Sequence, residues 1–94
     1  MPSRSLENYP RDIVNRVIDD FDADAISCVH LLLEDLGSDR LSRCALFMAD
    51  GSISGLENAV ALGKLDPRDL IYSAEYECAE RQLRDFNLPF PEKK

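Results

Sequence analysis

The stretch LSRCALFMADGSISGLENAVALGKLDPRDLIYSAEY, residues 41–76, decides the fold. It contains three segments whose apolar residues recur at steps of three and four, which is the spacing of a helix with one buried face: Leu41, Cys44, Ala45 and Met48; Ile53, Leu56 and Val60; Leu70, Ile71 and Ala74. Asp50-Gly51-Ser52 separates the first two segments, and Asp66-Pro67 opens the third with a capping aspartate and a first-turn proline. The pattern predicts helices over about residues 39–49, from Ser52 onward, and from Pro67 to about Phe86.

Two more amphipathic segments precede this centre. Apolar spacing predicts a helix over residues 9–20 and another over residues 23–36, the second ending at Gly37. The acidic run from Asp19 to Asp24 suits a junction between the two helices, because acidic residues destabilise the C-terminal end of a helix and stabilise the N-terminal end. One long helix from Pro10 to Leu36 is the alternative, since the apolar spacing continues across the run without Gly or Pro.

The five segments and their short connections predict one all-α domain over residues 1–94, a compact bundle of four or five short antiparallel helices. Residues 1–8 and 88–94 are expected to form loose ends. The chain is 45% hydrophobic and 31% charged, as in ordinary soluble domains. It has neither the roughly 20-residue apolar run of a transmembrane helix nor the apolar centre of a secretory signal, so we expect a cytoplasmic protein.

Charge narrows the class of partner. The formal net charge is −7, which opposes binding to nucleic acids and to anionic membranes. The imbalance is concentrated in residues 1–37, which hold 8 acidic and 3 basic residues. A basic partner would therefore meet the N-terminal half first.

The cysteines match neither a disulfide framework nor a zinc motif, because Cys28, Cys44 and Cys78 are odd in number and widely spaced. Each lies among apolar residues on a predicted helix, and we expect all three to be buried. His30, the single histidine of the sequence, is two positions from Cys28, which places the two side chains about 200° apart on a helix. A catalytic dyad is therefore not expected.

Asp20, Asp22 and Asp24 alternate like the first ligands of a calcium loop. Such a loop requires Gly at its sixth position and Glu at its twelfth, and here these are Ala25 and Leu31. The sequence thus indicates no metal, no cofactor and no catalytic residue.

The order Arg43-Cys44, Ala49-Asp50-Gly51, Leu56-Glu57 and then the run from Asp66 to Tyr76 resembles a group of short uncharacterised bacterial all-helical proteins. The likeness covers about the middle third of the chain. Members of the group often have Gly-Asp-Leu where this chain has Gly51-Ser52-Ile53, a difference that keeps a capping residue. The resemblance implies a bacterial cytosolic protein and carries over no activity and no functional residue.

Glu75 stands out because it falls within the apolar arc of the helix predicted from Pro67. A buried acid must be paired or pushed toward neutrality. Arg40 or Arg43, one helix pair earlier, can reach it, and a structural ion pair is the favoured interpretation. The alternative is an interhelical pocket in which Glu75 and Arg68 bind a ligand.

Four apolar positions exceed what one small bundle easily buries: Leu31, Leu46, Tyr72 and Tyr76. We expect them to form an interaction surface, so the sequence favours a non-enzymatic protein–protein interaction module. Self-association as a homodimer is its simplest form. The alternative is a small ligand-binding protein or enzyme that uses Glu75 and Arg68.

Overall fold

The computed structural model describes residues 6–78, 81–82 and 84–90. Within these residues five α-helices follow in order: α1 Arg11–Asp20, α2 Ile26–Glu34, α3 Asp39–Ala49, α4 Ile53–Leu65 and α5 Pro67–Glu75. Short 3₁₀ turns, Leu6–Asn8 and Ala23–Ala25, precede α1 and α2. Strands β1 Tyr76–Cys78 and β2 Arg81–Gln82 pair antiparallel after α5. The predicted all-α fold is confirmed, with this two-stranded ribbon added.

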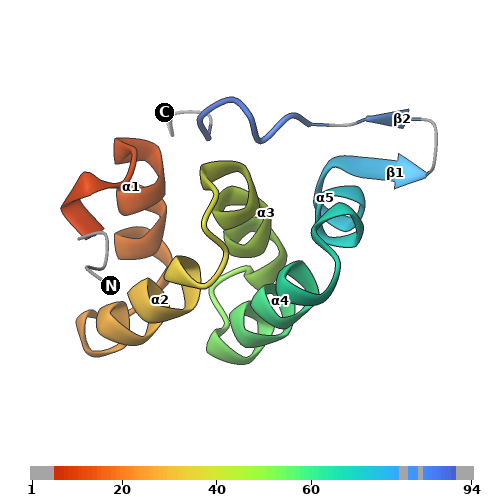
Figure 1. Ribbon diagram of the computed structural model, residues 1–94. Helices are drawn as coiled ribbons and strands as arrows, with labels where there is room; N and C mark the ends of the chain where they lie inside the picture. The colour runs from red at the N-terminus through yellow and green to blue at the C-terminus, as the bar shows by residue number, and fades with distance from the viewer. Residues whose placement is uncertain (1–5, 79–80, 83, 91–94) are drawn as a thin grey trace.

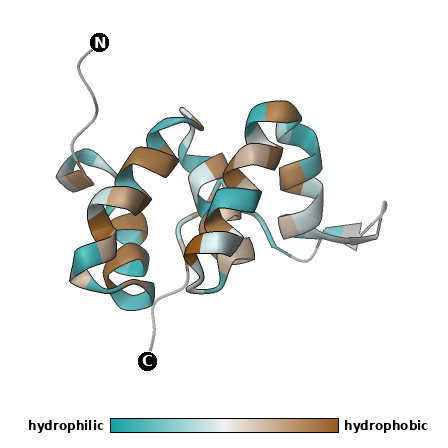
Figure 2. Cartoon of the chain, turned by 90° about the horizontal axis from the view of Figure 1, so that it is seen from below, coloured by the Kyte–Doolittle hydropathy of each residue, from teal (hydrophilic) through white to brown (hydrophobic). Residues whose placement is uncertain are grey.

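α3 is the central helix. It packs against α1, α4 and α5, and Figure 1 shows it between α1 and α2 on one side and α4 and α5 on the other. Hydrophobic and hydrophilic residues alternate along the surrounding helices, as Figure 2 shows. No helix among the described residues combines the length and the apolar character needed to cross a bilayer.

Three predicted helix starts are confirmed by their caps. The side-chain oxygens of Ser38, Ser52 and Asp66 accept hydrogen bonds from backbone N–H groups in the first turns of α3, α4 and α5. Each cap satisfies a donor that the helix leaves unpaired and typically contributes about 1 kcal/mol. Local sequence therefore predicts where α3, α4 and α5 begin.

Residues 10–36 form two helices, so the single long helix is wrong. α1 ends at Phe21, whose backbone is extended (φ −129°, ψ 147°) while its N–H still bonds to the Val17 carbonyl at 3.1 Å. The acidic run spans this break: Asp19 and Asp20 lie in the last turn of α1, where the negative end of the helix dipole disfavours acids, and Asp22 and Asp24 follow Phe21. Phe21 stays buried on the core side of the break.

The helix predicted to reach Phe86 is wrong beyond Glu75. Tyr76 is extended (φ −112°, ψ 142°), and the Arg84 N–H bonds to the Glu75 carbonyl at 3.2 Å, continuing the ribbon begun by β1 and β2. The chain then crosses the bundle as an extended strap, residues 84–90, which Figure 1 shows running over α3 toward α1. Phe86 is buried by this path. If residues 76–86 continued as a helix, exposed ion pairs one turn apart would each contribute only a few tenths of a kcal/mol. Burial of the Phe86 ring stabilises the strap by more than this.

Two further expectations about burial are wrong. Leu46 is fully buried on α3 and not part of a surface, because α1, α4 and α5 all pack against this helix. Cys28 is exposed on α2, whereas Cys44 is buried as expected. Cys28 is exposed because α2 is short and buries only Val29 and Leu33. The side chain of Cys78 lies outside the described residues.

Candidate functional site

The most concentrated polar cluster surrounds Glu75, at the last turn of α5. Its side chain is 0% exposed and forms two parallel hydrogen bonds with Arg40 of α3, from Nε to Oε2 (2.9 Å) and from Nη2 to Oε1 (2.7 Å). The Gln82 amide donates to Oε1 at 2.8 Å, and the Phe86 N–H donates to Oε2 at 3.2 Å. The thiol of Cys44 lies 3.8 Å from Oε2. Both carboxylate oxygens are thus occupied by groups of the protein itself.

This environment sets the ionisation of the cluster. Burial by itself would raise the pKa of Glu75, but hydrogen bonds from Arg40, Gln82 and the Phe86 N–H lower it below its usual value. The pKa of Arg40 is raised, chiefly by its hydrogen bond to Glu75. Burial and then the nearby negative charge of Glu75 raise the pKa of Cys44 to about 12, which leaves it a neutral, unreactive thiol.

A second ion pair lies one helical turn along α3. Arg43 donates from Nε and Nη2 to the two oxygens of Asp12 on α1, at 2.7 and 3.0 Å. Its Nη1 donates to the Phe86 carbonyl at 3.1 Å, and the Phe90 N–H donates to Asp12 at 3.1 Å. Burial would raise the pKa of Asp12, but the Arg43 hydrogen bond and the Phe90 N–H lower it.

The strap connects the two ion pairs. The N–H of Phe86 bonds to Glu75 and its carbonyl to Arg43, so one peptide segment joins both clusters. Phenylalanine rings continue the contact, with Phe86 5.4 Å from Phe47 and 5.5 Å from Phe90 between centroids. The guanidinium of Arg84 lies 4.4 Å above the Phe47 ring. The C-terminal segment is thereby docked on the bundle as far as Phe90.

The predicted pairing of Glu75 with an arginine of the earlier helix is confirmed, and Arg40 is the partner. Arg68, the other residue of the predicted pocket, is exposed on the first turn of α5, while Glu75 is buried at the last. Sequence reasoning missed Asp12, Gln82 and Phe86. Their partners lie between 7 and 78 positions away, and no local pattern links them.

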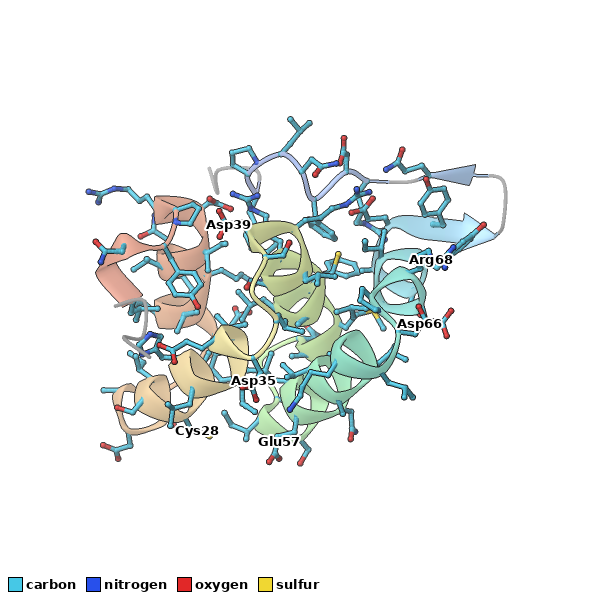
Figure 3. The ribbon with its side chains drawn as sticks, viewed as in Figure 1. Cys28, Asp35, Asp39, Glu57, Asp66 and Arg68 are labelled. Atoms are coloured by element: carbon cyan, nitrogen blue, oxygen red, sulfur yellow. The ribbon has the colours of Figure 1, made fainter. Side chains whose placement is uncertain are left out.

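The predicted interaction residues divide between two ends of the molecule. Tyr72 is 47% exposed on α5, and its ring lies 5.0 Å from that of half-buried Tyr76, tilted by 39°. Leu31 is 63% exposed on α2. Figure 3 shows the label of Cys28 on α2 at the lower left and those of Asp66 and Arg68 at the right, on the far side of α4.

The His30 side chain packs against neighbouring side chains of the protein. Its Nε2 lies 2.8 Å from Glu34 Oε1, one turn along α2, and its ring meets that of Tyr9 edge to face at 6.0 Å. Over the described ranges, no group of three His, Cys, Asp or Glu side chains is arranged to hold a metal ion. Comparison of the chain with protein-family models, with curated proteins and with solved structures gives no match.

Proposed function

We propose that this protein is a non-enzymatic protein–protein interaction module of the bacterial cytoplasm that self-associates through the outer face of α5. The observation that carries the proposal is the exposed Tyr72 ring, which packs at a tilt against the ring of Tyr76. Tyrosine is enriched at the centres of interfaces, because it supplies a large apolar area with little loss of conformational freedom. Leu65, the last residue of α4, is also exposed, with 85% of its surface accessible.

Charge favours a second copy as the partner for this face. Two copies that each carry a net charge of −7 repel each other in most orientations, so a contact between them requires a face with little net charge. The exposed charged residues of α5 are Arg68 and Asp69, which have opposite sign and are adjacent. A two-fold arrangement places the same patch on both subunits, so each Arg68 can approach the partner's Asp69 while the tyrosines pack.

The occupied state of Glu75 supports the non-enzymatic part of the proposal. A ligand at this carboxylate would have to displace Arg40, Gln82 or the Phe86 N–H, each within 3.2 Å. The Arg40–Glu75 and Arg43–Asp12 ion pairs both hold the strap against the bundle, which is a structural role. The residues best suited to acid–base or anion chemistry are thus engaged in folding.

Sedimentation equilibrium tests the proposal. We expect the wild type to form a dimer at about 100 µM and Tyr72→Ser to weaken it by about tenfold or more, since interface tyrosines often contribute over 1.4 kcal/mol. Leu31→Ser, at an exposed position on α2, is the matched control and should leave the dimer intact. A wild type that stays monomeric at this concentration would refute self-association.

A further inference from the structure

The outer face of α2 carries an exposed apolar centre between two acids. Leu31 is 63% exposed, Cys28 is exposed one turn before it, and Asp24 and Asp35 are exposed at either end. Cys28 and Leu31 lie one turn apart on α2, Asp24 lies in the 3₁₀ turn Ala23–Ala25 that leads into this helix, and Asp35 directly follows its last residue, so the steps between the four residues are four, three and four. We name these four residues the α2 stripe.

Charge identifies what can cover this stripe. Residues 17–39 hold seven acidic residues and neither lysine nor arginine. A second copy in a two-fold contact would set this acidic segment against itself, which costs free energy through repulsion. Nucleic acids and anionic membranes are opposed for the same reason. The remaining occupant is a basic protein segment.

The structure already contains one example of the expected contact. Lys64 of α4 places its ammonium 3.5 Å from Asp35 Oδ2, and the Asp35 side chain remains 52% exposed. An ammonium from another protein can therefore approach the same carboxylate from the solvent side. Asp24, at the opposite end of the stripe, is exposed as well.

We propose that the α2 stripe binds a basic amphipathic helix of another protein. Leu31 supplies the apolar anchor, and Asp24 and Asp35 pair with lysines or arginines of the partner. Asp24 precedes Leu31 by seven positions and Asp35 follows it by four, which correspond to about two helical turns and about one. The partner helix thus presents an apolar residue with basic residues about two turns to one side and one turn to the other. This site is separate from the α5 face and does not depend on self-association.

The test uses three synthetic helical peptides of about 18 residues against the full chain, a length that gives about five turns. One has a leucine stripe flanked by lysines, the second replaces the leucines by serines, and the third replaces the lysines by glutamates. Affinity is measured by fluorescence anisotropy at low salt and again at about 0.3 M salt. Protection of Cys28 from iodoacetamide, read by mass spectrometry, locates the bound peptide.

We expect the leucine–lysine peptide to bind, to protect Cys28, and to lose affinity at the higher salt. Leu31→Ser should weaken it about tenfold, the factor that corresponds to 1.4 kcal/mol, and Asp24→Asn should also weaken it. Tyr72→Ser is the matched control and should bind as the wild type does. Equal binding of the serine–lysine peptide, or unchanged affinity in Leu31→Ser, would overturn the proposal, as would unprotected Cys28 at saturation.

Discussion

The buried carboxylate of Glu75 accepts a hydrogen bond from the backbone N–H of Phe86 at 3.2 Å. In a continuous helix these two residues would be separated by about 16 Å, given a rise of 1.5 Å per residue. The contact therefore requires the chain to reverse after α5, which the β1–β2 ribbon accomplishes. The same carboxylate holds Arg40, so the end of α5, the start of α3 and the strap depend on one side chain.

Replacing Glu75 by glutamine should destabilise the protein by about 2–3 kcal/mol. The substitution removes the charge that Arg40 faces, and Arg40 is 30% exposed, so water compensates for part of the loss. Urea unfolding followed by circular dichroism measures the difference. Glu57→Gln, an exposed change on α4, is the control and should stay within about 0.5 kcal/mol of the wild type. An unchanged midpoint for Glu75→Gln would contradict the structural role of this ion pair.

Acidification should destabilise the protein through Glu75 and Asp12. Both carboxyls have folded-state pKa values below their ordinary values of 4.5 and 3.8. As the pH is lowered, the two carboxyls are protonated in the unfolded chain before they are protonated in the folded protein. The stability that they contribute is therefore complete above their ordinary pKa values and is lost as the pH falls toward their folded-state pKa values. Urea midpoints from about pH 7 to about pH 3 measure this loss. Glu75→Gln should show a shallower decline, and an equal slope in both proteins would contradict the assignment.

Replacing Gly63 by alanine should lower stability by about 1 kcal/mol, although alanine favours helices by a similar amount. A Cβ at this position would lie 2.7 Å from Leu36 Cδ2 and 2.8 Å from Leu70 Cδ2, and Leu70 is fully buried. Thermal or urea unfolding measures the outcome. Ser54→Ala, at an exposed position of the same helix, should be neutral or stabilising. If Gly63→Ala were as stable as Ser54→Ala, the close approach of the helices would be refuted.

The cysteines should differ in their reaction with iodoacetamide. Cys28 is exposed and should be alkylated in the native protein, whereas Cys44 is buried with its pKa raised to about 12 and should react only after unfolding. Mass spectrometry of proteolytic peptides assigns each site after a brief pulse. Rapid native labelling of Cys44 would show that the Glu75 cluster opens in solution.

Local sequence signals predicted most of the helices, because capping and apolar spacing depend on residues only a few positions apart. Ser52 and Asp66 cap the helices that they were predicted to start, and Ser38 caps α3, which begins at residue 39 as predicted. Leu46 was misplaced because spacing on one helix does not reveal how many neighbours surround it. The candidate site was only half predicted: a buried acid implied that Glu75 pairs with Arg40 or Arg43, but the structure decided that Arg40 is the partner, and Gln82 and Phe86 were not foreseen.

The sequence by itself determined an acidic all-α chain of four or five helices and the starts of α3, α4 and α5, because capping and apolar periodicity are local properties. Tertiary structure decided where the last helix stops and which side chains close the core. The residues after Glu75 have acceptable helical spacing, but docking Phe86 and Phe90 across α3 buries more apolar surface and satisfies the carboxylates of Glu75 and Asp12. Those gains come from residues 11 to 78 positions apart, so no local pattern could report them.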